Sequence, residues 1–144
     1  MLTFEHRLSV AGDISHTATL PFDLRQKSRL RITLDDGNEA GIILERGLYL
    51  RHGDLLKSKD GRVLRIIAAP EPVATVNCAD PLLLARACYH LGNRHVPLQI
   101  EATWLRLQRD HVLEDMLHHM GLHVQHEQAP FEPEHGAYGH HHEH

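Results

Sequence analysis

The sequence predicts an α+β protein with a small all-β domain, a domain that mixes helices and strands, and a polar tail. Three observations predict this order. Apolar–polar alternation and glycine-containing turns dominate the first half, helix start signals occur only beyond residue 80, and the end is rich in Pro, Gly and His. We therefore expect a β-rich domain over residues 1–70, a second domain over 71–129 and a disordered tail over 130–144.

The first half carries clear strand and turn signals. Arg29–Leu34 alternates polar and apolar residues, as a half-buried strand does. Asp35–Asn38 contains Gly and Asn, which tolerate the positive φ of a tight turn, so Ala40–Leu44 is expected to return antiparallel. The turn signal Lys59–Gly61 precedes a further strand over Val63–Ile67. No helix is expected before residue 80.

The pattern changes after a linker predicted over Ala69–Pro72, whose two prolines disfavour both a helix and a central strand. Val73–Cys78 suits a strand. Asp80 then caps a helix that Pro81 can begin, and Gly92 ends it. This helix is apolar on most sides, so we expect it to be largely buried.

The second domain continues with two strands, over Val96–Ile100 and Thr103–Gln108. In the first of these, Val96, Leu98 and Ile100 are expected to face the core, and His95, Pro97 and Gln99 to face outward. Pro97 favours an edge position for this strand.

A second helix follows, capped by Asp110 and ended by Gly121, before a last strand over Leu122–His126. Its predicted apolar face consists of Val112, Leu113, Met116, Leu117 and Met120. The order strand, helix, strand, strand, helix, strand is the βαββαβ arrangement of ferredoxin-like domains.

Composition excludes several classes of function. The chain has 144 residues, a 42% apolar share, a 24% charged share and a net charge of −4, which is typical of a globular protein without a basic surface for nucleic acid. No apolar run approaches the roughly 18 residues of a membrane span, and no signal peptide is recognisable. Its two cysteines, Cys78 and Cys88, are too few for a disulfide scaffold, so a cytoplasmic protein is expected.

The abundance of histidine is abnormal, because 15 of the 144 residues are His. Imidazole is a good ligand for nickel, copper and zinc, and a loose tract can place several around one ion. Ordering such a tract costs conformational entropy, so its sites should be weak and exchangeable. An expression tag is the bland alternative, but a tag is usually unbroken, whereas Glu143 interrupts this run. The tail histidines are His135, His140, His141, His142 and His144.

Two histidines outside the tail are further candidates. His95 follows a helix end on an outward face, although spacing alone favours an ordinary surface histidine unless a two-fold axis brings two copies together. His111 and Asp115 recur at one-turn spacing with His118 or His119. His118 and His119 are better interpreted as solvated residues at a helix end. For His111, spacing does not decide between a metal ligand and a surface residue.

Motifs for catalysis are absent from the sequence. There is no H-E-x-x-H, no G-x-S-x-G and no Walker A loop, and the acids and histidines fall in no recognisable catalytic spacing. We therefore expect a protein that is not an enzyme, with a metallohydrolase as a distant alternative.

The segment Cys88–Ile100, with Gly-Asn-Arg-His at its centre, resembles the signature of the UreE family of urease accessory proteins. Asp110–Leu117 and Pro130–Tyr138 are similar to the same family, and the resemblance covers nearly the whole chain. It implies a nickel metallochaperone with a peptide-binding-like first domain and a ferredoxin-like second domain that forms a homodimer. Partners implied by the resemblance are the urease accessory GTPase and the complex of urease apoprotein with its accessory proteins.

The resemblance also implies the ligands. His95 would bind nickel at the dimer interface with its counterpart, tail histidines would add ligands, and His111 would serve a peripheral site in some members. Arg109 stands where certain members have another histidine, and a cation there repels a divalent ion. Zinc or copper would substitute in vitro. Which tail histidine completes the site, and whether dimers pair into a tetramer on metal binding, stay open.

Two other functions remain as alternatives. In the first, a generic metal store or sensor, the tail does the binding and no partner receives the ion. In the second, the protein is an interaction module whose β domain binds polypeptide.

Overall fold

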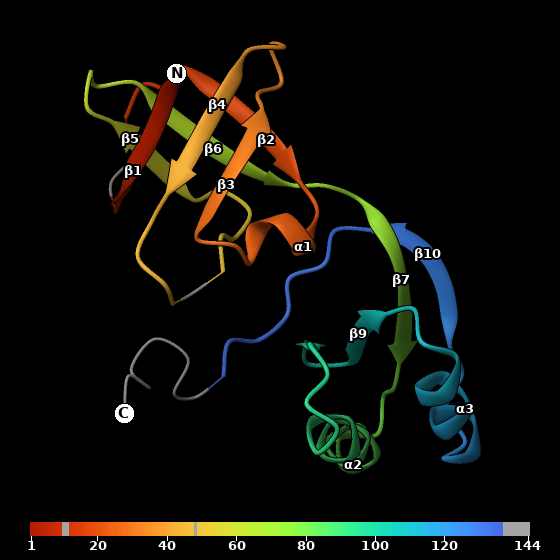
Figure 1. Cartoon of the computed structure of the whole chain (residues 1–144). Helices are drawn as coiled ribbons and strands as arrows, with labels where there is room; N and C mark the ends of the chain where they lie inside the picture. The colour runs from red at the N-terminus through yellow and green to blue at the C-terminus, as the bar shows by residue number, and fades with distance from the viewer. Residues whose placement is uncertain (10–11, 48, 137–144) are drawn as a thin grey trace. The chain divides into compact units, whose positions relative to one another are not determined.

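The computed structural model describes residues 1–9, 12–47 and 49–136, coloured along the chain in Figure 1. The chain divides into two compact units. Unit 1 comprises Met1–Ala69 together with the described residues His135 and Gly136, and unit 2 comprises Pro70–Glu134. Each unit has its own hydrophobic core, and each is described by itself.

Unit 1 is built on a six-stranded sheet in the order β2-β6-β5-β1-β4-β3 (Figure 1). The β1/β4 and β2/β6 pairs are parallel and the other pairs antiparallel. The predicted turns are confirmed, because Gly37 and Gly61 adopt positive φ between β3 and β4 and between β5 and β6. The strands are β1 (Leu2–Leu8), β2 (His16–Leu20), β3 (Arg29–Thr33), β4 (Glu39–Ile43), β5 (Leu55–Ser58) and β6 (Val63–Ala68).

The two outer strands of this sheet are joined by polar contacts, so that it becomes a near-barrel. The Asp35 N–H after β3 donates to the carbonyl of Thr17 in β2 at 2.9 Å. The Asp35 carboxylate accepts from the Thr17 hydroxyl at 2.7 Å and from the hydroxyl and N–H of Thr19 at 2.9 and 3.2 Å. His16 Nδ1 lies 2.8 Å from an Asp36 carboxylate oxygen. These contacts close a sheet whose edges would otherwise be open to pairing.

A single helical turn, α1 (Phe22–Arg25), follows β2, where no helix was expected. It carries a buried arginine: Arg25 Nε donates to the Leu20 carbonyl at 3.0 Å and Nη1 to the Leu50 carbonyl at 3.1 Å. One turn is too short to give a periodic signal in the sequence, which explains why the pattern missed it.

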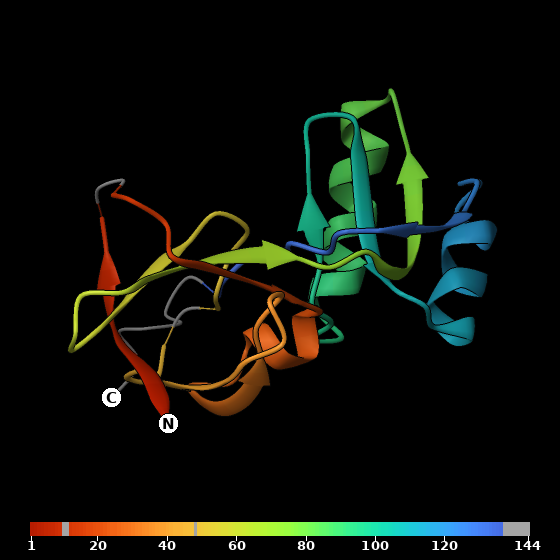
Figure 2. The same ribbon diagram turned by 90° about the horizontal axis from the view of Figure 1, so that it is seen from above.

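Unit 2 confirms the ferredoxin-like order. Its elements are β7 (Glu71–Asn77), α2 (Pro81–Gly92), β8 (Gln99–Ile100), β9 (Trp104–Gln108), α3 (His111–His119) and β10 (Gln125–Ala129). The four strands form an antiparallel sheet in the order β10-β7-β9-β8. Both helices pack on one face of this sheet through the core residues of unit 2, and both views of the ribbon show them (Figures 1 and 2).

Both predicted helix caps of unit 2 are confirmed. The Asp80 side chain accepts from the N–H groups of Leu82 and Leu83 at 3.0 and 3.4 Å, and that of Asp110 accepts from the Leu113 N–H at 3.0 Å. A capping carboxylate satisfies amides that have no partner within the helix.

Three sequence predictions for unit 2 are wrong in detail. Glu71 and Pro72 belong to β7 and not to a linker; Pro72 pairs only with β10, because the pairing of β7 with β9 begins one residue later. The last strand begins at Gln125 and not at Leu122, because Leu122 and Val124 are buried in the loop that precedes it.

The third error concerns the helices. α2 is not buried on most sides: Leu82 and Tyr89, seven residues apart on one helix face, are 58% and 66% exposed. On α3, Val112 is 63% exposed and does not belong to the apolar face.

The chain beyond β10 has no regular secondary structure, but its first residues are packed. Phe131 is fully buried, and three hydrogen bonds hold residues 130–134 on unit 2. We call these residues the strap; it is part of the irregular blue segment after β10 in Figures 1 and 2. Residues 137–144 of the expected tail, with His140, His141, His142 and His144, lie outside the described residues.

Candidate metal centre

His95 lies in the loop directly after α2 and is exposed to solvent. Its backbone N–H donates to the Gly92 carbonyl at 3.0 Å, and the preceding Arg94 N–H donates to the Leu91 carbonyl at 3.0 Å. These bonds wind the last turn of the helix into the loop. The carbonyl end of a helix carries partial negative charge, so a cation bound here would be favoured.

The backbone of His95 is strained. With φ at 57° it is the one residue other than glycine with a positive φ among those that the structure describes. The left-handed conformation costs an L-residue roughly 1–2 kcal/mol, and strain of this kind concentrates at functional sites. A glycine would adopt this conformation without cost, so the presence of histidine points to a use for its side chain.

The strand predicted after His95 is shorter than expected, and the burial of its residues differs from the prediction. β8 contains only two residues; Gln99 is buried, whereas Ile100 is 40% exposed. The predicted directions hold, because Gln99 lies beside Arg106 on the face away from the helices and Ile100 lies beside Leu105 on the core face. The exposure differs from expectation only because Gln99 is covered and Ile100 is at the edge of the sheet. The strap covers Gln99, since the Gln99 side-chain oxygen accepts a hydrogen bond from the Glu132 N–H at 2.9 Å.

His111 begins α3, and its side chain is 89% exposed. Its Nε2 lies 3.4 Å from an Asp115 carboxylate oxygen, one turn along the helix. The backbone carbonyl of Asp115 lies 2.8 Å from Nδ1 of His119. His118 is exposed in the last turn, where a positive charge is favoured by the helix dipole. One imidazole and one carboxylate at His111 give half of a metal site at most.

Arg109, the cation expected to repel a metal beside His111, is held by a buried carboxylate. Its Nε lies 3.2 Å from one oxygen of Glu114, and His126 Nε2 lies 2.5 Å from the other. Burial by itself raises the pKa of Glu114, but hydrogen bonds from His126, the Asp110 N–H and Arg109 outweigh it and hold that pKa below its usual range. No periodic pattern predicts this cluster, because the fold assembles it from the residue after β9, from α3 and from β10.

His135 lies within unit 1. Its ring stacks on Tyr49 with 4.3 Å between ring centroids, and Arg51 Nε approaches its Nε2 at 3.2 Å. The Tyr49 N–H approaches the other ring nitrogen at 3.4 Å. In a neutral imidazole only one ring nitrogen has a free lone pair, so only one of these two N–H groups can donate to the ring at a time. A metal bound by that nitrogen would displace the donor.

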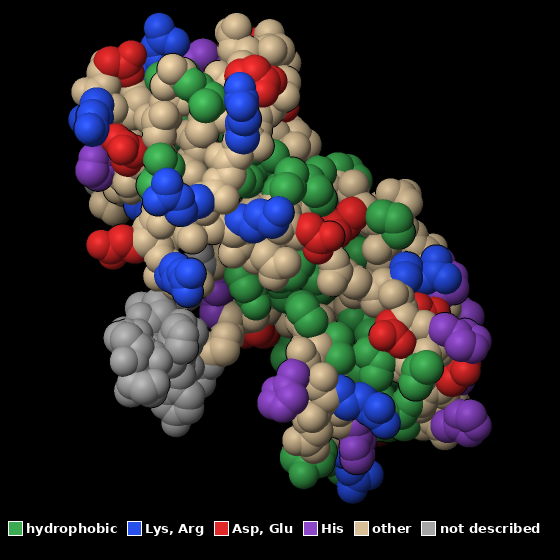
Figure 3. All heavy atoms as spheres, viewed as in Figure 1, with side chains coloured by type: hydrophobic (Ala, Val, Ile, Leu, Met, Phe, Trp, Pro, Cys, Tyr) green, Lys and Arg blue, Asp and Glu red, His purple; other side chains and the backbone are tan. Residues whose placement is uncertain are grey.

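The described residues form no complete metal site. Within residues 1–9, 12–47 and 49–136, no three His, Cys, Asp or Glu side chains are close enough to hold a metal ion. His95 and His111 belong to unit 2 and His135 to unit 1, and the remaining tail histidines lie outside these ranges. On the face drawn in Figure 3, histidine side chains in purple are exposed over the helices of unit 2.

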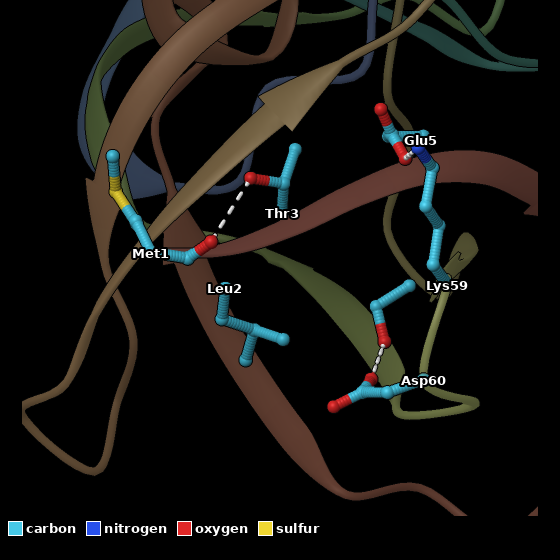
Figure 4. Close-up of a pocket in the computed structure, with 7 residues that line it drawn as sticks. Met1, Leu2, Thr3, Glu5, Lys59 and Asp60 are labelled. Atoms are coloured by element: carbon cyan, nitrogen blue, oxygen red, sulfur yellow. Dashed lines mark hydrogen bonds and ion pairs between the residues drawn. The ribbon is translucent and has the colours of Figure 1, made fainter.

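A cavity of about 340 Å³ in unit 1 is lined by residues of β1 and of the turn after β5, including Glu5, Lys59 and Asp60 (Figure 4). Its Glu5 and Lys59 side chains lie 3.9 Å apart, and Asp60 accepts a hydrogen bond from Ser58. These charged groups satisfy one another, and no histidine or cysteine lines the cavity.

Comparisons with known proteins identify both units. The profile described as "UreE urease accessory protein, N-terminal domain" matches residues 6–69, and that of the C-terminal domain matches residues 71–144. The two matches follow one another along the chain and meet near the boundary between the units. Both units therefore correspond to one class of protein, a two-domain urease accessory protein.

Curated relatives agree over nearly the full length. Proteins named "Urease accessory protein UreE" are 62% identical over 141 residues in Pseudomonas putida strain GB-1 and 60% identical over 139 residues in Alkalilimnicola ehrlichii. These alignments cover 96% of this chain and 86% and 85% of the relatives. The protein of that name from Citrobacter koseri is 55% identical over 150 residues, covering 100% of this chain and 99% of the relative. The chain belongs to the UreE family of urease accessory proteins.

Membership of this family confirms several predictions. UreE proteins are chaperones of urease maturation and not enzymes, and the family binds nickel. No helix among the residues described has the length and apolar character to span a membrane.

Proposed function

We propose that this protein is a nickel metallochaperone that delivers nickel for assembly of the urease active site. The observation that carries the proposal is the strained, exposed histidine at the end of α2. In a homodimer, a two-fold axis beside His95 would place two imidazoles together, and histidines of the C-terminal tail would complete the coordination of the ion. His111 with Asp115 would form a weaker, peripheral site.

The exposed face of α2 supports a dimer axis near His95. Leu82 and Tyr89 are large apolar side chains on one face of the helix that ends at Gly92, three residues before His95. Exposed apolar groups on one helix face are typical of a surface that a partner covers. An isologous contact through α2 would bring the loops after both helices towards the same axis.

The chemistry of the ligands suits delivery. Imidazole, carboxylate and water bind nickel in exchangeable sites, and a site without thiolates releases the ion more readily. Zinc and copper would compete in vitro. We propose that the nickel passes to the urease accessory GTPase and the complex of urease apoprotein with its accessory proteins, in the cytoplasm.

Nickel titration calorimetry on three proteins tests the proposal: the full chain, His95→Ala, and a chain ended after Gly139. We expect His95→Ala to abolish the tightest binding event, while the shortened chain mainly loses capacity. His118→Ala is the matched control, because His118 is also exposed near a helix end of unit 2. Unchanged binding in His95→Ala, with all binding lost from the shortened chain, would instead identify a tail-driven metal store.

A further inference from the structure

The left-handed backbone of His95, with φ at 57°, has to be held in place by the residues around it. Strain of this kind persists only where the surrounding structure fixes the chain on both sides. On the helix side, the N–H groups of Arg94 and His95 donate to carbonyls of the last turn of α2, both at 3.0 Å. The angle φ describes rotation about the bond that follows this nitrogen, so the residues after His95 decide whether the strain is kept.

The chain after His95 is held by the core of unit 2 and by the strap. Val96 packs against the core and Leu98 belongs to it. The Leu98 carbonyl accepts from the Glu134 N–H at 2.8 Å, and the Gln99 side chain accepts from the Glu132 N–H at 2.9 Å. Leu98 is three residues after His95, a span of about 10 Å at most, so the strap is attached close to the strained residue.

The strap has the alternation of an extended segment. Phe131 and Pro133 are buried, whereas Glu132 and Glu134 between and after them direct their N–H groups to the β8 edge. In an extended chain successive side chains point to opposite sides, so two buried side chains can share one side. The strap is therefore anchored by apolar burial and by backbone hydrogen bonds together.

The start of the strap is fixed on the sheet face opposite the helices. Arg106 of β9 donates from Nη1 to the Pro130 carbonyl at 3.0 Å. Its guanidinium is in turn held by Thr75 Oγ1 at 2.9 Å and by a Glu127 carboxylate oxygen at 3.4 Å. Arg106 pairs with Thr75 on one side and with Gln99 on the other, so these three side chains share a face.

The end of the strap also lies near the helix that leads to His95. Burial raises the pKa of the Cys88 thiol on α2, and the negative charge of Glu134 raises it further, which indicates that this carboxylate is near the C-terminal part of the helix. Glu134 is thus close to α2 before the loop and bonded to Leu98 after it. The strap spans both ends of the loop that contains His95.

We propose that the strap holds the backbone of His95 in its left-handed conformation and so aims the imidazole, with Gln99 and Phe131 as positioning residues. The proposal rests on the proposed function, in which this imidazole binds nickel, and it involves only described residues of unit 2. When the strap leaves, Leu98 and Gln99 lose their bonds to it. His95 then relaxes to a negative φ, which turns its side chain away from its direction relative to α2.

A pair of substitutions at His95 reports its backbone conformation without nickel. Glycine is favoured over alanine where φ is positive, and alanine is favoured over glycine where the chain is extended. We therefore expect the unfolding constant of unit 2 to be about fivefold smaller in His95→Gly than in His95→Ala. Urea unfolding of the full chain, followed by the fluorescence of the single tryptophan, Trp104 in unit 2, measures both.

The same pair is measured with the strap released, in the background Gln99→Leu/Phe131→Ser. The first change removes the acceptor for the Glu132 N–H and the second the buried ring, and amide hydrogen exchange at Glu132 and Glu134 reports the release. We expect the fivefold preference for glycine to vanish or reverse, and to fall by a smaller factor in the milder background Gln99→Leu. In the control background Gln128→Leu, exposed on the opposite edge strand, it should remain fivefold. A merely structural role would destabilise both members of the pair equally and leave the preference unchanged.

Nickel affinity, measured by competition with a chelator, tests the consequence for the site. Release of the strap should weaken nickel binding at least about fivefold when His95 is present, because only the left-handed fraction presents its imidazole correctly. In the His95→Ala protein the same release should leave nickel binding unchanged.

Three results would overturn the proposal: an unchanged preference for glycine when the strap amides exchange freely, strap amides that stay protected in the double variant, or unchanged nickel affinity on release while His95→Ala binds weakly. The pair of variants at His95 separates this failure from that of the proposed function. If His95→Ala binds nickel as tightly as the parent, the proposed function fails, and the preference for glycine alone decides whether the strap holds the backbone.

Discussion

The two units differ in how much apolar surface they leave exposed on one element and in whether their backbone is strained. In unit 1, Asp35 and His16 join the outer strands, and the exposed large apolar residues lie apart, at the chain start, in a loop and at a strand end. Unit 2 leaves Leu82 and Tyr89 exposed on one helix face and holds His95 in a strained conformation nearby. Unit 2, which has the exposed apolar helix face and the strained histidine, is therefore the unit in which a partner and a ligand are expected.

The largest expected effect comes from charging the apolar face of α2. Leu82→Glu should raise the dimer dissociation constant roughly thirtyfold or more, about 2 kcal/mol, because an unpaired carboxylate would be buried in the contact. Light scattering over a dilution series measures it. Val112→Glu is a close control, since Val112 is also the second residue of a capped helix and is similarly exposed. Equal masses for both variants at every concentration would place the dimer contact elsewhere.

Opening the near-barrel of unit 1 should have a smaller effect. Asp35→Ala removes the acceptor of three hydrogen bonds from β2, so we expect a loss of about 1–2 kcal/mol and faster amide exchange at Thr19. Asp60→Ala is the control, because Asp60 also accepts from a hydroxyl and an N–H, but only within its own turn. If both variants changed exchange in β2 equally, the idea that Asp35 closes the sheet would be wrong. Nickel binding should not change in either variant.

The sequence predicted the features of both units that depend on local rules. The caps at Asp80 and Asp110 and the turns at Gly37 and Gly61 follow from local backbone chemistry, and the structure has all four. The errors occur where distant residues decide. Alternation placed Gln99 on the correct face, but the side chain is buried there because Glu132, 33 residues later, donates to it.

The candidate site divides in the same way. The Gly-Asn-Arg-His segment singled out His95, but no pattern in the sequence indicates that this histidine has a positive φ. The contact of His135 with Tyr49 joins residues 86 apart, beyond any periodicity. The sequence signal for the strap was Phe131, because it is a large apolar residue without a polar group in a segment made mostly of Pro, Glu, Gly and His.

The smallest expected effect concerns the pH dependence of unit 2. Because hydrogen bonds hold the pKa of Glu114 below the ordinary 4.5, its ionised form stabilises the folded state. That contribution is present above the unfolded pKa and is lost as the pH falls through the lower, folded pKa. Glu114→Gln should therefore cost about 1 kcal/mol near neutral pH, with the difference from the parent shrinking below pH 4.5.

Urea unfolding at several pH values, followed by the fluorescence of the single tryptophan, Trp104 in unit 2, measures this difference. The exposed acid Asp115 supplies the control, because Asp115→Asn should change stability little at any pH. If the loss of unfolding free energy in Glu114→Gln stayed constant down to acid pH, packing and not the charge of Glu114 would position Arg109 and His126. In that case the charge of Glu114 would not be what holds Arg109 in place beside His111.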